Sequence, residues 1–305
     1  PTGALVTDLE SHVTAFDEVQ ARFDEESNIY WGDELSKAGV NVIYSYDELK
    51  VHAKVCLVER EENGKDVRYA FLSSGNFNEK TAKIYCDHGM LTSDVRLTDE
   101  CEKVFKYLEN REYKPEFDHL LVAPFLLREK LKELIRKEIE NVRAGRKGRI
   151  ILKVNSLEDK DMIKQLYKAS NAGVKIKIIV RGICCLIPGV KGMSENIQII
   201  SIVDRFLEHA RVYIFHNDGD EMIYIASADW MKRNLSRRVE VAFPLYDKGI
   251  RDEVRDIIRF QLKDNTKARK VNITQSNPYR KFVKRDRVER AQYDTYYYLK
   301  RKHLG

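Results

Sequence analysis

Two short segments of the sequence place a histidine two positions before a cation. His52 precedes Lys54 in VHAKVCLVE, and His209 precedes Arg211 in EHARVYIFH, each at the start of an apolar run. Residues two apart in a β-strand project from the same face, so each imidazole is expected beside its cation. A neighbouring positive charge keeps an imidazole neutral and nucleophilic, and it also stabilises a transferring phosphoryl group. The segments therefore predict nucleophilic chemistry on phosphorus.

The two segments belong to a longer internal repeat. A shift of 157 residues lays His52 on His209. In each copy the histidine is followed by a predicted hairpin and then by a serine in a turn, Ser74 and Ser227. Core patterning alone does not select polar residues in the same order. The repeat therefore indicates two related units that share one polar site.

Each unit also contributes an acid, 13 residues beyond its serine. We expect Asp87 to accept the second ring N–H of His52, and Glu240 to accept that of His209. Each carboxylate would then hold its imidazole in one tautomer. Two such units facing each other across a pseudo-twofold axis would bring both imidazoles and both cations into one cleft.

The remaining polar positions of the repeat are expected to bind phosphate. The segments SSGNFNEK and SADWMKRN resemble strand-to-helix turns, whose backbone N–H groups could hold phosphate oxygens. An arginine also ends an apolar run upstream of each histidine, at Arg22 and Arg181. Tyr85 shares a face with Asp87 if that segment is extended, either as a packed side chain or as a ligand. The candidate phosphate ligands from the turns and cations are Ser74, Asn76, Arg181, Arg211 and Arg238.

Helices and strands alternate along the chain, which predicts an α/β fold. We expect two tandem domains, each a mixed β-sheet flanked by helices, spanning residues 1–115 with His52 and 116–305 with His209. The proline-bearing segment 111–124 is the expected linker. Strands are predicted at 41–45, 53–59, 68–74, 149–155, 174–180, 197–203, 210–216, 221–227 and 239–245. Helices are predicted at 98–110 behind a Thr98 cap, 127–145, 156–173 opening at Ser156, and 247–262.

Composition narrows the class of protein. The chain has 305 residues, 43% of them hydrophobic, and no run long enough to cross a bilayer. The net charge of +6 allows polyanionic partners, although the basic segment 280–292 is expected to be a solvated helix. No Cys-x-x-Cys occurs, so reduced thiols are expected rather than a zinc site. Because the chain begins with Pro1, we expect a fragment.

The duplicated histidine motif resembles the phospholipase D fold, whose halves each give a histidine to a shared phosphoryl-transfer site. The chain departs from the usual motif, because Glu59 stands where an aspartate follows the lysine by five residues. The acids come from Asp87 and Glu240 instead. With that departure, the chain resembles the C-terminal half of bacterial polyphosphate kinases, although residues 1–19 do not match it. The segments that carry the resemblance are ARFDEESN, SSGNFNEKTAKIYCD, IIVRGICCLIPG and SIVDRFLEHARVYIF.

The resemblance implies reversible transfer of the terminal phosphate of ATP onto polyphosphate, through a phosphohistidine and with Mg²⁺. It implies His52 as the phosphorylated residue and Arg22 as an arginine of the magnesium or phosphate site. It implies Tyr85, Arg181 and His209 as nucleotide-site residues. It also implies a homo-oligomer of the full-length protein in the cytoplasm, with or without peripheral membrane contact. Because the family's N-terminal domains are absent, weak ATP binding by this chain alone is expected.

Two other functions remain open on the sequence. One is a phospholipase D-like phosphodiesterase or nuclease, in which water resolves the covalent intermediate and no ATP is needed. The other is a basic nucleic-acid-binding module, whose binding would weaken steeply with salt. No nucleic acid partner is expected, because the basic residues do not form a strip interleaved with aromatic residues.

Overall fold

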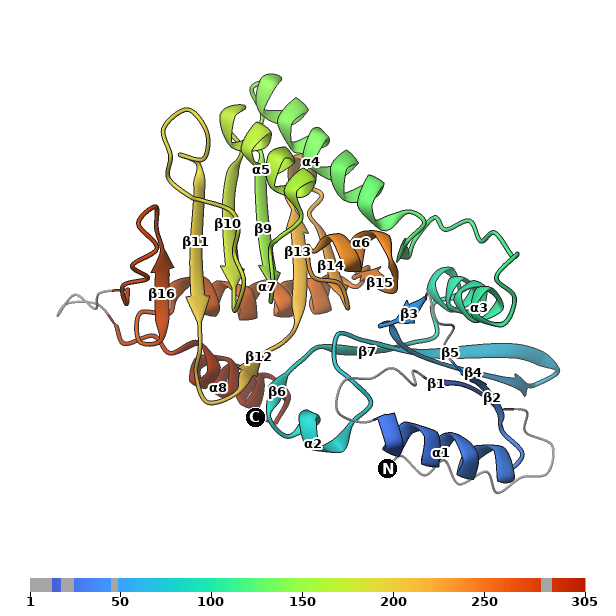
Figure 1. Ribbon diagram of the computed structural model, residues 1–305. Helices are drawn as coiled ribbons and strands as arrows, with labels where there is room; N and C mark the ends of the chain where they lie inside the picture. The colour runs from blue at the N-terminus through green and yellow to red at the C-terminus, as the bar shows by residue number, and fades with distance from the viewer. Residues whose placement is uncertain (1–12, 18–24, 45–48, 281–286, 305) are drawn as a thin grey trace.

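A mixed sheet built mainly by the second half of the chain forms the centre of the molecule (Figure 1). The computed structural model describes residues 13–17, 25–44, 49–280 and 287–304. The strand order is β16-β11-β10-β9-β13-β14-β15-β3, and β8 pairs with β15 as well. Strands β9, β10 and β11 are parallel to one another, β13 and β14 run antiparallel to their neighbours, and β15 is antiparallel to β14 and β8. The second-half bounds are β8 (Leu121–Ala123), β9 (Arg149–Val154), β10 (Lys175–Val180), β11 (Ile197–Ile202), β13 (Arg211–Phe215), β14 (Met222–Ala226), β15 (Arg238–Pro244) and β16 (Ala268–Val271).

Helices cover both faces of this sheet, because neighbouring strand residues point to opposite faces and both faces are apolar. On one face Leu131 and Leu166, from α4 and α5, share a core with Leu152. On the other face Val254 of α7 shares a second core with Val212. The helix bounds are α4 (Leu127–Arg143), α5 (Lys160–Asn171), α6 (Lys232–Ser236), α7 (Lys248–Lys263) and α8 (Ala291–His303), with a 3-10 turn η1 (Asn217–Gly219).

The first half is smaller, and its described strands form separate sheets rather than the single mixed sheet we expected. An antiparallel sheet has the order β4-β5-β7, and β1 pairs with β2 in parallel. The expected hairpin joins β4 to β5, with positive φ at Asn63 and Gly64. The bounds are β1 (Thr14–Asp17), α1 (Glu25–Lys37), β2 (Asn41–Tyr44), β4 (Lys54–Glu62), β5 (Lys65–Ser73), α2 (Glu79–Ala82), β7 (Gly89–Thr92) and α3 (Val95–Glu109).

Two helix starts differ from the sequence prediction. Helix α3 is capped by Asp94, whose side chain accepts from the amide of Arg96, while Thr98 is buried inside the helix. Helix α5 is capped by Asp159, whose carboxylate accepts from two backbone amides, so Ser156 precedes the helix. In both cases an aspartate competes with the hydroxyl residue, and its charge also interacts favourably with the helix N-terminus.

Two connecting segments also differ from expectation. The segment 111–124 is not merely a linker, because it ends in β8, which is buried against β15. The basic segment 280–292 was expected to be a helix, but its described residues 280 and 287–290 are not helical, and only its last two residues belong to α8, which begins at Ala291. Within the described part of the chain, no helix combines the length and apolar character that a bilayer crossing needs.

Two short parallel strand pairs connect the halves and fix the pseudo-twofold relationship. Strand β3 (Lys50–Val51) of the first half pairs with the start of β15, with Val51 opposite Val239. Strand β12 (Leu207–Glu208) of the second half pairs with β6 (Tyr85–Cys86) of the first, with Glu208 opposite Cys86. In each half, the short strand before the histidine therefore pairs with the residues that precede the acid of the other half.

Candidate active site

The crossed strand pairs bring each histidine to the acid of the opposite half. The amide of His52 donates to the carbonyl of Val239 at 2.9 Å, and the amide of His209 donates to the carbonyl of Cys86 at 3.1 Å. The next residue along each receiving strand is the acid. Both backbone arrangements are equivalent under the repeat, so the expected pair of facing units is confirmed.

Glu240 holds His52 in one tautomer. Nδ1 of His52 lies 2.9 Å from Oε2 of Glu240. The carboxylate is fully buried, yet His52, Lys54 and Ser227 outweigh the effect of burial and lower its pKa to about 2. An ionised carboxylate can only accept, so Nδ1 carries the proton and Nε2 carries the lone pair. Ser227 and Asn234 also donate to Glu240 and fix its orientation.

Asp87 holds His209 in the same way. Nδ1 of His209 lies 2.8 Å from one oxygen of Asp87, and the hydroxyl of Ser74 donates to that oxygen at 2.7 Å. Gly75 makes room for the carboxylate, because a Cβ there would stand 2.7 Å from Cγ of Asp87. In each repeat the serine therefore contacts the acid that lies 13 residues later, a contact that the sequence pattern did not predict.

The prediction of which acid serves which histidine was wrong. We expected Asp87 to orient His52 and Glu240 to orient His209, whereas the contacts are His52–Glu240 and His209–Asp87. The repeat pattern places an acid in each half but says nothing about which half it faces. The exchange of β3 and β12 between the halves decides the pairing.

The two cations occupy equivalent positions but have different surroundings. The Nζ of Lys54 donates to the carbonyl of its own His52, and Nη1 of Arg211 donates to the carbonyl of its own His209 at 2.9 Å. Arg211 also forms a buried ion pair with Asp229 at 3.0 Å. The charges of Lys54 and Arg211 both act on both histidines, which places all four groups in one cationic site.

Burial, rather than the cations, is the largest influence on the imidazoles. It lowers the pKa of His52, with Glu240 opposing the shift and Lys54 and Arg211 adding to it. It also lowers the pKa of His209, again opposed by the carboxylate partner. Burial lowers the pKa of Lys54 to about 7, with Glu240 opposing and Arg211 reinforcing the shift. Both histidines are therefore neutral near neutral pH, as the sequence argument required.

Three of the remaining predicted ligands, Tyr85, Arg181 and Arg238, interact with this centre or with residues that contact it. The ring of Tyr85 packs against that of His209, with centroids 4.9 Å apart. The Nε of Arg181 donates to Asn155 at 3.0 Å, and the amide nitrogen of Asn155 donates to the carbonyl of His209. The charge of Arg238 acts on Lys54. Asn76 is exposed on the turn after β5, and Arg22 lies outside the described residues.

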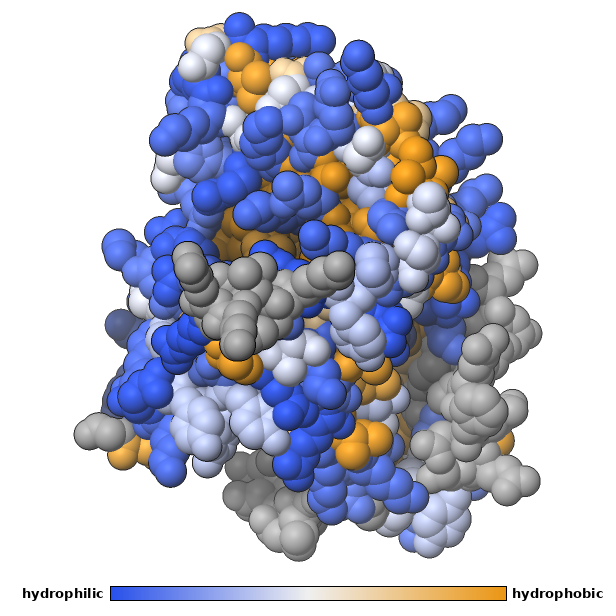
Figure 2. All heavy atoms as spheres, turned by 90° about the vertical axis from the view of Figure 1, so that its left-hand side faces the viewer, coloured by the Kyte–Doolittle hydropathy of each residue, from blue (hydrophilic) through white to orange (hydrophobic). Residues whose placement is uncertain are grey.

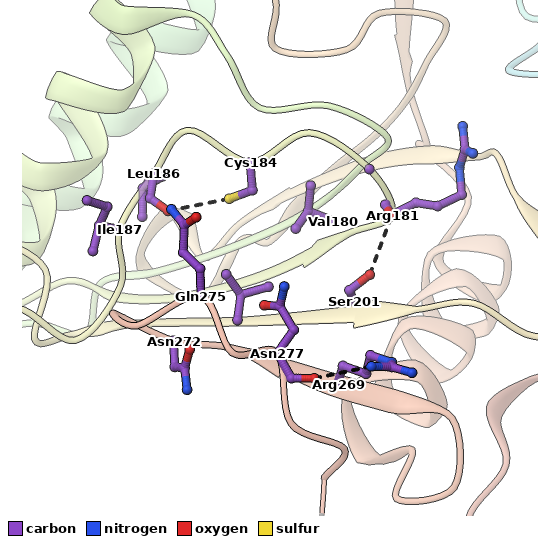
Figure 3. Close-up of a pocket in the computed structure, with 12 residues that line it drawn as sticks. Val180, Arg181, Cys184, Leu186, Ile187, Ser201, Arg269, Asn272, Gln275 and Asn277 are labelled. Carbon is purple, nitrogen blue, oxygen red and sulfur yellow. Dashed lines mark hydrogen bonds between the residues drawn. The ribbon is translucent and has the colours of Figure 1, made fainter.

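A pocket of about 240 Å³ adjoins Arg181 at the end of β10 (Figure 3). Arg181 is one of the lining residues, and in this view its side chain extends away from the amides of Gln275 and Asn277. On the face that carries β16 and β11, hydrophilic residues dominate and apolar ones gather in a central hollow (Figure 2).

The donor set does not fit a magnesium ion held by protein side chains. Magnesium prefers oxygen ligands, but Asp87 and Glu240 already accept from the imidazoles. Among the described residues, no three His, Cys, Asp or Glu side chains are grouped to hold a metal. The predicted arginine, Arg22, would have no lone pair to offer an ion.

Two site residues escaped the sequence prediction, Asp229 and Asn155. Asp229 anchors Arg211 and accepts from the backbone amides of Asn155 and Ser156. A signal for Asp229 was available, since it stands two residues after Ser227 as Asn76 stands two after Ser74. Asn155 follows a strand outside the repeat landmarks, so nothing in the spacing pointed to it.

Comparison with known proteins agrees with this geometry. The family model described as polyphosphate kinase C-terminal domain 1 matches residues 5–114, and that of C-terminal domain 2 matches residues 120–292. Polyphosphate kinases of Vibrio parahaemolyticus and Escherichia coli K12 are 49% and 50% identical over 95% and 94% of this chain. The chain spans only 41% and 42% of their lengths.

A solved structure gives the same result in three dimensions. The crystal structure of polyphosphate kinase from Porphyromonas gingivalis matches 96% of this chain and 44% of its own, with a TM-score of 0.89 and 42% identity. The α/β fold and the resemblance expected from the sequence are thereby confirmed. The chain belongs to the polyphosphate kinase family, whose two C-terminal domains it contains.

Proposed function

We propose that the protein transfers the γ-phosphate of ATP reversibly to polyphosphate, through a phosphohistidine at His52. The proposal takes its substrates from the relatives named polyphosphate kinase. It takes its mechanism from the paired imidazoles in a cationic site. We also propose a division into domains 1–115 and 116–305, which the ends of the two family models support.

One observation carries the choice of nucleophile: the two imidazoles differ at Nε2. That of His209 lies 3.1 Å from Nη1 of Arg211, which donates to it. For Nε2 of His52, the described residues supply no hydrogen-bond partner, and 24% of this side chain is exposed. A nucleophile needs a free lone pair and access to phosphorus. His52 meets both conditions.

The reaction would proceed in two displacements. The Nε2 lone pair of His52 forms a bond to the γ-phosphorus, and the bond to the bridging oxygen breaks with its electron pair left on ADP. Glu240 accepts the hydrogen bond from Nδ1–H of His52 and stabilises the imidazolium that forms. A terminal oxygen of polyphosphate then attacks the same phosphorus, and the electron pair of the P–N bond returns to Nε2.

The surrounding residues would bind and neutralise the phosphates. Lys54 and Arg181 supply positive charge to the equatorial oxygens of the transferring group, which needs electrostatic stabilisation more than covalent help. Tyr85 would contact the nucleotide beside His209. Mg²⁺, expected with ATP, would screen phosphate charge, since no three His, Cys, Asp or Glu side chains among the described residues are grouped to hold it.

The test is polyphosphate formation from ATP by the protein, with His52→Ala and His209→Ala as variants. Polyphosphate should form with the unchanged protein and should be lost with His52→Ala. Release of p-nitrophenol from bis-p-nitrophenyl phosphate without ATP, together with no polyphosphate, would overturn the proposal in favour of a hydrolase.

A further inference from the structure

The two halves of the site treat their cations differently at one pair of equivalent positions. Two residues beyond the serine of each repeat, the first half has Asn76 and the second has Asp229. Asn76 is an exposed neutral amide. Asp229 is a buried carboxylate, with 7% of its surface exposed. The two halves therefore differ in charge at these equivalent positions near the histidines.

Asp229 fixes the guanidinium of Arg211 at two points. Its Oδ2 accepts from Nη2 at 3.0 Å and its Oδ1 lies 3.3 Å from Nε. The carboxylate is itself held by the amides of Asn155 and Ser156 at 2.7 and 3.1 Å. A planar guanidinium gripped along one edge has a fixed direction for its remaining donors. Here that direction is toward His209.

The fixed donor occupies the lone pair that His209 would need for attack. Nη1 of Arg211 lies 3.1 Å from Nε2 of His209 while it also donates to the carbonyl of His209. Because Nδ1 of His209 carries the proton that it donates to Asp87, Nε2 is the acceptor in this contact. In the first half, Lys54 donates to the carbonyl of His52 and the described residues give it no carboxylate partner.

We propose that Asp229 determines which histidine accepts the phosphoryl group, by clamping Arg211 onto Nε2 of His209. Asp229 is a positioning residue that acts through Arg211. The clamp prevents His209 from acting as a nucleophile, so His52 alone accepts the phosphoryl group. This inference deepens the proposed function and rests on it for the identity of the natural phosphoryl donor.

A chemical phosphorylating agent tests the inference without ATP. With phosphoramidate, the Nε2 lone pair forms the new P–N bond, and ammonia leaves with the electron pair of the bond that breaks. The rate of labelling at each imidazole thus reports the availability of its lone pair. Near pH 8 both imidazoles are neutral, and mass spectrometry of peptides kept at alkaline pH would give the two rates.

The decisive variant is Asp229→Asn. The amide retains an oxygen for the backbone amides of Asn155 and Ser156, but it lacks the charge and the second acceptor that grip Arg211. We expect labelling of His52 to exceed that of His209 in the unchanged protein. In Asp229→Asn, labelling of His209 should rise by about tenfold, since a hydrogen bond from a charged donor is lost.

A matched control is Asp159→Asn. Asp159 is also buried and forms a two-point ion pair with Arg128, at 3.0 and 2.6 Å, but Arg128 makes no contact with either histidine. This variant should leave the ratio of the two labelling rates unchanged. Equal labelling of both histidines in the unchanged protein would overturn the inference. So would an unchanged rate at His209 in an Asp229→Asn protein that keeps its melting temperature.

The ¹⁵N NMR signal of Nε2 of His209 in the unchanged protein provides a second measurement that needs no variant. It should show a hydrogen-bonded acceptor, and a free-nitrogen signal would contradict the clamp. If ATP fails to label His52 while phosphoramidate gives the expected labelling rates, only the proposed function is contradicted. The two failures are therefore distinguishable.

Discussion

Glu240 accepts a hydrogen bond from Nδ1–H of His52, 188 positions away in the sequence, because β3 of the first half pairs with β15 of the second. The equivalent contact joins His209 to Asp87 across 122 positions. Neither half contains a complete histidine–acid pair. Both histidine–acid pairs of the candidate site thus need residues from both halves.

Crossed pairing predicts a specific pattern of energetic coupling. In double-mutant cycles, His52→Gln with Glu240→Gln should couple by about 0.5–3 kcal/mol, as residues in contact do. The same is expected for His209→Gln with Asp87→Asn. The control cycle is His52→Gln with Asp87→Asn, which should be close to additive. The measurement is the urea midpoint and slope of each variant. Stronger coupling in the control cycle than in the first would refute the crossed arrangement.

Lys54 predicts an alkaline loss of activity. Its pKa of about 7, caused mainly by burial, means that the ammonium loses its proton as pH rises through that value. The kcat/KM for ATP should therefore fall above about pH 7, since this parameter reports the free enzyme. Lys54→Arg keeps its charge at higher pH and should lose this alkaline limb, whatever its absolute rate. Superimposable alkaline limbs for the two proteins would exclude the role assigned to Lys54.

Tyr85 is predicted to help keep His209 neutral. Its ring packs on that imidazole, and burial is the main cause of the lowered pKa of His209. Tyr85→Ala admits water and should raise that pKa toward the ordinary value. Tyr85→Phe keeps the ring and serves as the matched control. NMR titration of His209 gives both values, and identical results for the alanine and phenylalanine variants would disprove the packing role.

Stability should fall on mild acidification. Burial lowers the pKa of His88 to about 4, with the charge of Lys153 adding to the shift, and the pKa values of His52 and His209 are also lowered. Below about pH 6.5 the unfolded chain binds protons that the folded chain does not. The free energy of unfolding therefore decreases from about pH 6.5 toward 4.

Urea unfolding at several pH values between 7.5 and 5 measures this decrease. His88→Gln should flatten the pH dependence relative to the unchanged protein, because the lowered pKa of His88 contributes to the decrease. The explanation fails if the unchanged protein has the same stability at both ends of that range.

The repeated residues of the candidate site could be found in the sequence, because the residue types around His52 and His209 recur with the same spacing. Their catalytic roles stay predictions. The sequence located both acids and both cations for the same reason. It could not predict the crossed pairing, since β3 and β12 are two-residue strands without a hydrophobic pattern of their own. Their partners are set by the packing of the two halves.

Asymmetric features were harder to predict than symmetric ones. The repeat does not point to Asp229, because its counterpart is the neutral Asn76 and a repeat indicates only residue types that occur in both halves. The apolar spacing from Cys101 onward predicts a cap at Thr98, whereas Asp94, one turn earlier, caps α3. The homo-oligomeric state and the cytoplasmic location stay predictions.

Site-mapped phosphorylation by [γ-³²P]ATP decides whether His52 is the phosphorylated residue. The protein should acquire an acid-labile, base-stable label on Nε2 of His52, and His52→Ala should acquire none. A label that persists in His52→Ala, or that maps to His209 in the unchanged protein, would contradict the account.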